Sequence, residues 1–309
     1  RRDVRVANLS LLNTDWYIRQ LRDQAPKVDI GWSDAEISRL RPYWDTKADK
    51  GVYVKDLAVH HIVGRESGKR PLYVATTVPD LMGLESRLVM KGVVFEVQEA
   101  IAGREERIDA DATLHALNEV YLYRGLLLPD GRPDDSVYKD ENARRLVQNY
   151  SAALLQAAEA KLEEKDKEAA LAAIEKAQAV SPGSRAIRYS TGLLLLRAGE
   201  YEEAERRLNE VLAEIPDDPR IFRLLGRAQE AGGRLDEAEA TYRRMVAADP
   251  GDFEYFGDFF SFLWQVREKR SEAVDLLRGW AERHPDEPAL ARTLQAYEDS
   301  LAFYSGRSR

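Results

Sequence analysis

The sequence contains no cysteine and few histidines. Without cysteine the chain can form no disulfide framework, no cysteine-based zinc or iron–sulfur site and no thiol nucleophile. The histidines are too few and too scattered for a histidine metal cluster, so we predict no metal site. They are His60, His61, His115 and His284. The first two are adjacent, but they point roughly 100° apart on a helix. They cannot share a metal, and we interpret them as structural.

The common catalytic motifs are also missing. The sequence has no Walker loop, no GxGxxG segment after a strand, no GxSxG elbow and no HExxH motif. No nucleophile stands in a recognisable pair with a base. We therefore predict no catalytic residue and no cofactor in this chain.

Long apolar runs and an excess of positive charge are absent as well. The longest apolar runs, such as residues 126–129 and 193–196, cover only a few positions, whereas a membrane-spanning helix needs about 20. The chain has 46 Lys and Arg against 54 Asp and Glu, which gives a net charge of −8. A general nucleic-acid binder gains affinity by neutralising phosphates, so this charge argues against a nucleic-acid partner.

In the second half of the sequence, prolines and small residues recur with a period of 34 residues. Pro182, Pro216 and Pro250 lie 34 residues apart, and Pro285 follows after 35. Two further columns share the period: the small residues Ala158, Gly192 and Gly226, and the alanines Ala170, Ala204, Ala238 and, one residue late, Ala273. The pattern predicts one helical hairpin per repeat. The small residue and the alanine let its two helices pack closely, and the proline ends it because proline cannot continue a helix.

These columns resemble the tetratricopeptide repeat family over about residues 149–285. The residues that carry the resemblance are Phe222, Leu225, Gly226, Ala238, Tyr242 and Pro250 in the third unit, Gly192, Ala204, Leu208 and Pro216 in the second, and Ala158, Ala170, Ile174 and Pro182 in the first. The resemblance implies a right-handed superhelix of paired helices. We expect four hairpins over residues 136–309 and a capping helix from Ala289 to about Tyr304. The fourth unit departs from the pattern, with Phe260 in place of the small residue.

In such repeats the first helix of each hairpin lines the concave groove. There the third unit places Arg220, Arg223 and Arg227 on one helical face. An arginine stripe suits a carboxylate or phosphate on a peptide, lipid or glycan, and the alternative is a solvated helix face. The equivalent positions Glu159, Leu193 and Ser261 do not extend the basic character, and the Lys/Asn pattern of chaperone-binding members is missing. We expect a protein or peptide partner in this groove.

The fourth unit is unusually rich in aromatic residues. Seven aromatic residues lie between Phe253 and Trp264. We interpret most of them as core between the last hairpin and its cap. Seven rings exceed what one helix face buries, so the alternative is that some form an exposed contact patch.

The first 135 residues predict a small α/β sandwich. Residues 4–12 are a strand candidate, and residues 72–78 and 88–97 are rich in β-formers. Residues 16–22, 32–43, 54–64 and 113–123 are typical of helices, the second of them capped by Ser33. We expect parallel pairing between the first two strands. A link rich in Pro, Asp and Gly over residues 129–135 marks the predicted boundary with the repeats.

One candidate ligand site lies at the predicted turn from the first strand into the first helix. The residues are Asn13, Thr14, Asp15, Trp16 and Tyr17. Helix-start amides favour anions, and α/β sheets place ligands at such turns. The alternative is capping by Asn13 or Thr14, with Trp16 and Tyr17 packed on the sheet.

The opening segment, Asp3 to Ile18, resembles the segment that follows the last membrane helices in a bacterial family of multi-pass proteins. That family is related to protein O-mannosyltransferases and other membrane glycosyltransferases of the GT-C type, and its members often end in tetratricopeptide repeats. The resemblance implies a preceding membrane domain that uses a lipid-linked sugar and carries the catalytic carboxylate. It also implies that this chain is an extracytoplasmic, periplasmic portion, and that residues 13–17 lie near the acceptor or donor site.

Three hypotheses follow for the function. The first is a recognition and scaffold region of a membrane-embedded glycosyltransferase-like protein. We expect the chain to be a piece of a longer polypeptide because it begins at Arg1, without an initiator Met or a signal peptide. The second is a self-contained soluble scaffold or adaptor. The third is a glycan-acting enzyme that uses Asp15 in the α/β domain.

Overall fold

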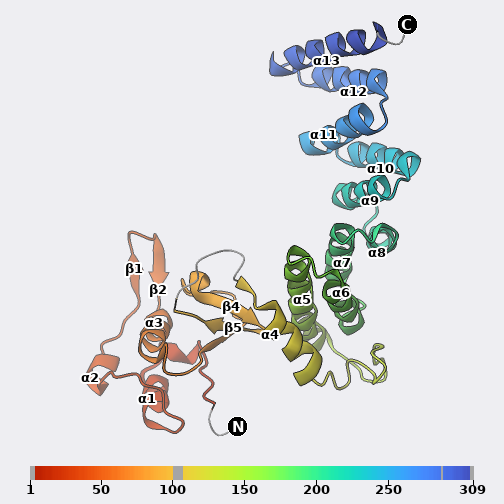
Figure 1. Ribbon diagram of the computed structural model, residues 1–309. Helices are drawn as coiled ribbons and strands as arrows, with labels where there is room; N and C mark the ends of the chain where they lie inside the picture. Colours follow the sequence, from red (N-terminus) through yellow and green to blue (C-terminus); the bar gives the residue numbers. More distant parts are fainter. Residues whose placement is uncertain (1–3, 100–106, 287, 307–309) are drawn as a thin grey trace. The chain divides into compact units, whose positions relative to one another are not determined.

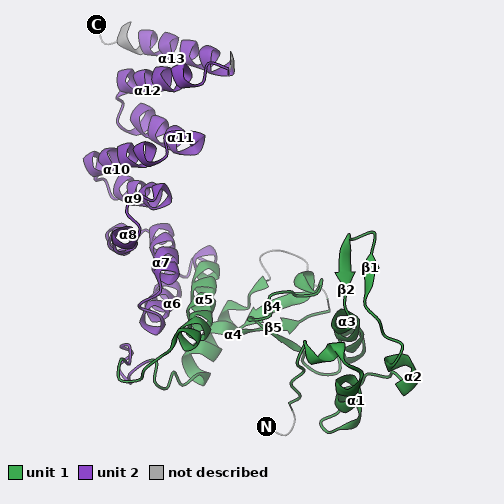
Figure 2. Ribbon diagram, turned by 180° about the vertical axis from the view of Figure 1, so that it is seen from behind, with its two compact units in different colours: residues 1–126, 135–161 green, residues 127–134, 162–309 purple. Residues whose placement is uncertain are grey.

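The computed structural model describes residues 4–99, 107–286 and 288–306 (Figure 1). It divides into two compact units (Figure 2). The N-terminal unit comprises residues 1–126 and 135–161, and the repeat unit comprises residues 127–134 and 162–309. Most of the helix predicted to open the first repeat is therefore grouped with the N-terminal unit. The domain boundary at residue 135 stays a prediction.

The N-terminal unit combines helices with two small antiparallel sheets. One sheet pairs β1 with β2, and the other has the strand order β3-β5-β4. The elements in chain order are η1 (Leu11–Asn13), α1 (Asp15–Asp23), α2 (Asp34–Ile37), β1 (Tyr43–Asp45), β2 (Lys50–Val52), α3 (Val54–Glu66), β3 (Tyr73–Ala75), η2 (Glu85–Arg87), β4 (Leu88–Lys91), β5 (Val94–Val97), α4 (Ala110–His115), the π-helical segment η4 (Ala116–Val120) and α5 (Glu141–Glu163), which ends in the repeat unit.

Three expectations for this unit differ from the structure. Residues 4–12 form no strand, because Val4 and Val6 are exposed and no buried face holds the segment in a sheet. The predicted parallel pairing is absent from the two sheets, whose strands are all antiparallel. The predicted helix over residues 32–43 is shorter than expected and corresponds to α2, Asp34–Ile37; Pro42 disfavours helical geometry at Arg41 and so excludes the end of the predicted range. Its predicted cap is confirmed, because the Ser33 hydroxyl accepts from the Glu36 amide.

Helices α1 and α3 and the strand β3 confirm further predictions, and the run over residues 88–97 forms the two strands β4 and β5. The helix predicted over residues 113–123 begins earlier as α4 and continues as η4 to Val120. The core lies between α1, α2, α3 and the segment before β4. Its most deeply buried side chains include Leu12, Ile18, Leu21, Ile37 and Leu84. This core fixes the turn between η1 and α1 that carries the N-terminal candidate residues.

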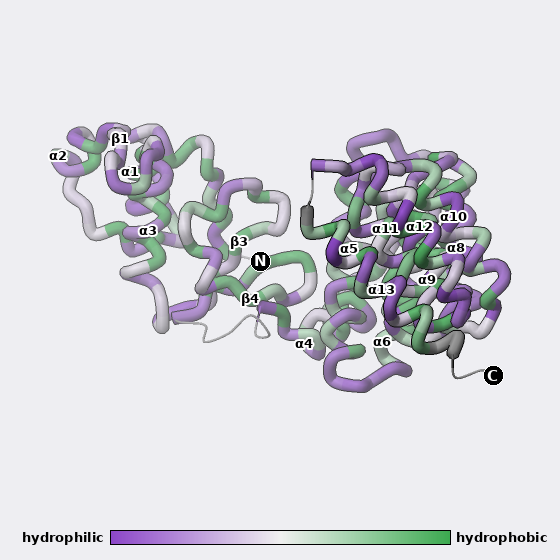
Figure 3. Tube along the Cα trace, turned by 90° about the horizontal axis from the view of Figure 1, so that it is seen from above, coloured by the Kyte–Doolittle hydropathy of each residue, from purple (hydrophilic) through white to green (hydrophobic). Residues whose placement is uncertain are grey.

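The repeat unit is a succession of helices in which each successive pair forms a hairpin (Figure 1). Most helices carry hydrophobic and hydrophilic residues side by side, as expected for elements with one buried face (Figure 3). The elements are α6 (Lys167–Val180), α7 (Arg185–Arg197), α8 (Tyr201–Glu214), α9 (Pro219–Ala231), α10 (Leu235–Ala248), α11 (Phe253–Ser261), the π-helical segment η5 (Phe262–Val266), α12 (Arg270–Arg283) and α13 (Pro288–Gly306).

The repeating columns have the packing roles predicted for them. A Cβ atom on Gly192 would lie 2.8 Å from Cγ of Leu208, and one on Gly226 would lie 2.6 Å from Cε1 of Tyr242. The glycines therefore give space to a side chain of the second helix. The alanine column is fully buried at Ala170, Ala204, Ala238 and Ala273. Each proline of the period follows two residues after the end of a second helix.

The fourth hairpin contains one residue more than the others, at the π-helical segment. The Arg267 amide donates to the Phe262 carbonyl, 3.0 Å away and five residues earlier, which is the spacing of a π-helical turn. This extra residue explains why Ala273 and Pro285 arrive one position late.

The aromatic run of this hairpin is mainly core. Phe256, Phe259, Phe260 and Phe262 are buried, whereas Phe253 is 61% exposed. The predicted capping helix is α13, whose Tyr297 ring lies 4.7 Å from the rings of both Phe260 and Trp264. Within the described ranges, no helix combines the length and hydropathy that crossing a bilayer requires.

Candidate functional site

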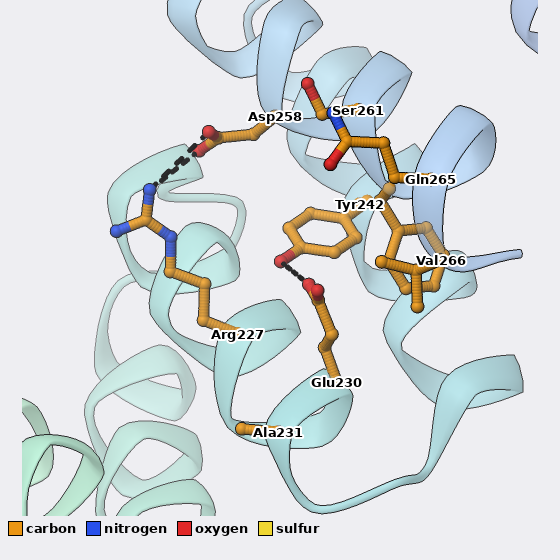
Figure 4. A pocket seen from close by; sticks show the side chains of 9 residues that line it. Arg227, Glu230, Ala231, Tyr242, Asp258, Ser261, Gln265 and Val266 are labelled. Carbon is orange, nitrogen blue, oxygen red and sulfur yellow. Dashed lines mark hydrogen bonds and ion pairs between the residues drawn. The ribbon is translucent and has the colours of Figure 1, made fainter.

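The repeat unit holds a pocket of about 350 Å³ between its third and fourth hairpins (Figure 4). We call it the groove pocket. One wall is the C-terminal half of α9, and the other is α11 with the π-helical segment that follows. The lining residues are Arg227, Glu230, Ala231, Tyr242, Asp258, Ser261, Phe262, Gln265 and Val266. The two helices that form these walls, α9 and α11, are capped at their N-termini. The Asp218 side chain accepts from the Arg220 amide, and the Asp252 side chain accepts from the Glu254 and Tyr255 amides.

Of the predicted arginine stripe, the structure places one residue in the pocket. Arg227 lines it, and its guanidinium lies 3.3 Å from the Asp258 carboxylate. Arg223 contacts Asp258 at 2.5 Å and Glu254 at 2.9 Å. Arg220 lies apart from them, with an exposed side chain that pairs with Asp218 at 2.7 Å. Each arginine of the stripe is therefore paired with a carboxylate.

Sequence reasoning missed these counter-charges. Glu254 and Asp258 lie 31 residues beyond Arg223 and Arg227, close to one period. Side chains at that spacing on successive first helices face each other, so a comparison of columns could have found the pairs. The hydrogen bond from Arg220 also lowers the pKa of the Asp218 carboxyl below its ordinary value.

On the floor of the pocket, Glu230 and Tyr242 are hydrogen-bonded to each other. The Tyr242 hydroxyl donates to a Glu230 carboxylate oxygen at 2.8 Å (Figure 4). Burial raises the pKa of the Tyr242 phenol, and the neighbouring Glu230 charge raises it further, so the hydroxyl stays a donor at neutral pH. Among the described residues, no Lys, Arg or His forms an ion pair with Glu230.

Three of the N-terminal candidate residues are engaged within the fold. The Asn13 side-chain oxygen accepts from the Lys55 amide at 3.0 Å and so caps the start of α3. The Thr14 hydroxyl donates to the Leu11 carbonyl at 2.6 Å. Tyr17 is buried, and its hydroxyl accepts from the Asn8 amide at 2.9 Å. The burial of Tyr17 agrees with the packing alternative, but the capping alternative differs from what is observed, because Asn13 caps α3 and the Thr14 side chain accepts from no amide of α1.

The other two candidates face solvent. Trp16 is 56% exposed, and Asp15 forms a long ion pair of 3.8 Å with Arg19 one helical turn away. Sequence reasoning also missed further exposed aromatics of this unit. Tyr43, Trp44 and Tyr53 are each more than half exposed on or beside the β1–β2 ribbon. The N-terminal unit therefore presents aromatic rings to its surroundings.

The adjacent histidines serve different parts of the N-terminal unit. A ring nitrogen of His60 lies 2.6 Å from the Met82 carbonyl, and one of His61 lies 2.5 Å from the Ile30 carbonyl. The His61 ring stacks on Trp32 with a centroid distance of 4.0 Å. Within the part of the chain that the structure describes, no group of three or more potential ligands could hold a metal ion.

Comparison with known families gives two matches. A model described as tetratricopeptide repeat matches residues 155–219 and 189–253. A second model, described as TMEM260-associated domain 2, matches residues 1–41. No curated protein matches the chain.

Solved structures with similar chains include three repeat proteins. MamA from Desulfovibrio magneticus RS-1 is 21% identical, with 48% of this chain and 87% of that chain covered and a TM-score of 0.38. YrrB, titled a TPR protein with an unusual peptide-binding site, is 18% identical, with coverages of 50% and 83% and a TM-score of 0.37. A tetratricopeptide repeat protein from Parabacteroides merdae ATCC 43184 is 15% identical, with coverages of 63% and 81% and a TM-score of 0.37.

These TM-scores are low, so the identification rests on the family model and on the packing of the hairpins. The matched residues contain the glycine, alanine and proline columns. The helical hairpins between residues 155 and 253 are therefore tetratricopeptide repeats.

Proposed function

We propose that this chain is a non-catalytic recognition and scaffold region whose repeats bind a protein or peptide partner in the groove pocket. The observation that carries the proposal is the pocket itself, which two successive first helices enclose. Ser261 and Gln265 line it, and neither side chain forms a hydrogen bond with another described residue. Their amide and hydroxyl groups are suited to the backbone of a bound segment. Of the arginine stripe, Arg227 then stands beside the bound segment, Arg223 lies next to it, and Arg220 lies farther away at the start of α9.

Site-specific photocrosslinking in cells tests this proposal. A photoreactive amino acid at Ser261 or Gln265 lies in the pocket, and the same amino acid at Ala240, exposed on α10, serves as the control. We expect a discrete adduct from the two pocket positions and none from Ala240. Equal labelling from all three positions, or no adduct from the pocket, would contradict the proposal.

For the N-terminal unit, we propose docking on a membrane domain that precedes it in a longer polypeptide. The resemblance of residues 3–18 to GT-C-type membrane proteins and the family match over residues 1–41 support this assignment. The exposed rings of Trp16 on α1 and of Tyr43, Trp44 and Tyr53 on or beside the β1–β2 ribbon are suited to burial against another domain. In this arrangement the α/β domain over residues 1–135 lies on the extracytoplasmic, periplasmic face. Residues 13–17 then lie nearest the membrane domain and its sugar acceptor or donor.

The genomic sequence upstream of Arg1 tests this second part. We expect it to encode about ten or more apolar segments of roughly 20 residues each. A reading frame that starts near Arg1 would instead favour a self-contained soluble adaptor, which the repeats support equally well. Glycan transfer by the isolated chain that Asp15→Asn abolishes would favour the enzyme hypothesis.

A further inference from the structure

We propose that the groove pocket selects partner segments that present a Lys or Arg side chain, and that Glu230 is the residue that binds this cation. The inference rests on the proposed groove function and specifies its ligand chemistry. It differs from the anionic ligand that the arginine stripe alone suggests. The difference follows from how the charges around the pocket are paired.

The positive charges near the pocket are already balanced. Arg223 and Arg227 share the Asp258 carboxylate, and Arg223 also contacts Glu254. Two cations thus face two carboxylates. An incoming phosphate or carboxylate would have to displace Asp258 from both arginines, and would remain close to its negative charge.

Glu230 is a pocket carboxylate that no cation of the described residues balances. Its contact in the described structure is the neutral Tyr242 hydroxyl, which occupies one carboxylate oxygen. The other carboxylate oxygen is available to a ligand. A half-buried carboxylate without a cation has lost part of its hydration and gains most from a charged donor.

The carboxylate is also held in place. Tyr242 is 2% exposed, and its ring packs so closely on Gly226 that no Cβ atom fits between them. Because the ring is fixed, its hydroxyl orients the Glu230 carboxylate before any ligand arrives. Pre-oriented groups bind at a lower entropic cost than mobile ones.

The remaining pocket wall suits the rest of a basic side chain. Ala231 and Val266 contribute exposed apolar surface, against which the methylene groups of Lys or Arg can pack. Ser261 and Gln265 lie on the same face of the opposite wall, one helical turn apart, and offer neutral hydrogen-bonding groups. Figure 4 shows Arg227 and Asp258 paired at one side of the pocket, and Glu230 directed toward Tyr242 on its floor.

Peptide libraries with one fixed central residue test the inference. The full chain is immobilised and exposed to three libraries of otherwise randomised peptides, in which the central residue is Lys, acetyl-lysine or Glu. We expect the Lys library to be retained roughly tenfold more than either of the others. In Glu230→Gln this preference should disappear while retention of acetyl-lysine peptides stays unchanged. The matched control Glu237→Gln, on an exposed carboxylate of α10, should keep the preference.

The outcomes separate this inference from the groove function. Retention of all three libraries without a preference would overturn the role of Glu230 and leave the groove function standing. A preference for Lys that survives Glu230→Gln would likewise overturn it. If no library is retained, the inference fails, and the crosslinks from Ser261 and Gln265 decide whether the groove function fails with it. Circular dichroism spectra of both variants establish that a lost preference does not reflect unfolding.

Discussion

The third and fourth hairpins differ at the position of the first helix where the repeat pattern has a small residue. In the third hairpin, position 226 is glycine, and the ring of Tyr242 from the second helix occupies the space above it. In the fourth, the corresponding residue is Phe260, which is 8% exposed and inserts its own ring. That ring packs on Trp264 and on Tyr297 of the capping helix. One hairpin receives a side chain at this position, and the other supplies one.

The two hairpins also differ in how closely the backbones of their two helices approach each other. The backbones of α9 and α10 approach each other closely along their length, whereas α12 approaches the first helix of its hairpin, α11 with η5, at fewer positions. The fourth hairpin also carries the extra residue of its π-helical segment, next to Phe260. The comparison teaches that a small residue is needed where the second helix directs a side chain at the first, as Tyr242 does at Gly226, whereas Phe260 packs instead on the capping helix.

The largest effect that we expect comes from removing the inserted ring. Phe260→Ala should lower the free energy of unfolding by about 3–5 kcal/mol, because the cavity lies between α11 and α13 and its walls can close only in part. Chemical denaturation followed by circular dichroism measures the loss. Phe253→Ala, at a ring that is 61% exposed, should cost well under half as much. Equal losses for the two variants would show that Phe260 is not a core residue.

The converse change in the third hairpin adds a group where space is missing. Gly226→Ala should lower the free energy of unfolding by about 2–3 kcal/mol, since the new Cβ atom would lie 2.6 Å from Cε1 of Tyr242. The Tyr242 ring cannot move away easily, because its hydroxyl is bound to Glu230. The matched control is Gly257→Ala in α11, where a Cβ atom meets nothing within 4 Å. It should stabilise the chain by up to about 1 kcal/mol. The same denaturation experiment compares the two variants. The free energy of unfolding should fall in Gly226→Ala and rise in Gly257→Ala, and a change of the same sign in both would contradict the prediction.

The third hairpin could be predicted from the sequence because its packing rule recurs at a fixed spacing. Gly192 and Gly226 lie one period apart in the sequence, and each marks a close approach of two helices. The fourth hairpin showed its difference in the sequence as Phe260 in place of the small residue and as a one-residue delay at Ala273 and Pro285. Nothing in the sequence located the extra residue within the helix, since a π-helical turn depends on backbone hydrogen bonds rather than on a residue type.

The two candidate sites show a similar limit. The stripe from Arg220 to Arg227 follows from helical spacing, but its counter-charges lie on the next repeat, and only the three-dimensional stacking brings them together. In the N-terminal unit, residues 4–12 were predicted to form a strand, yet the apolar side chains Val4 and Val6, which alternate along the segment, are exposed. Alternation predicts a strand only where a partner covers one face. No repetition was present there to reveal the partner.

A smaller effect sharpens the comparison at the junction of the two hairpins. Glu239 of α10 is 4% exposed and bridges to the loop after the π-helical segment, with Arg267 at 2.8 Å and Lys269 at 2.6 Å. Burial alone would raise the pKa of Glu239, but hydrogen bonds from Lys269 and Arg243 outweigh burial and lower it. Glu239→Gln should therefore cost about 1–2 kcal/mol at pH 7, with allowance for the partly exposed cations.

The pH dependence of this cost has a definite sign. Because the folded pKa of Glu239 is lowered, its stabilising contribution is present above the pKa of the unfolded carboxyl and is lost as the pH falls through the folded pKa. Denaturation of the wild type and Glu239→Gln at several pH values should give a difference that shrinks toward acidic pH. A difference that grows as the pH falls would contradict the assignment of Glu239 as the ionised partner of Lys269.

The smallest effect concerns the residue that ends each first helix in left-handed geometry. Gly199 and Gly233 take this position in the second and third hairpins, while Glu268 takes it in the fourth with a φ of 55°. Glycine adopts this geometry without the steric cost that a Cβ atom brings. Glu268→Gly should therefore stabilise the chain by about 1 kcal/mol, since its exposed ion pair with Arg270, at 3.5 Å, contributes little. The melting temperature, followed by circular dichroism, should rise by a few degrees. Glu237→Gly, in the first turn of α10, should lower it. A fall of the melting temperature in both variants would contradict the prediction that a glycine at position 268 relieves the cost of left-handed geometry.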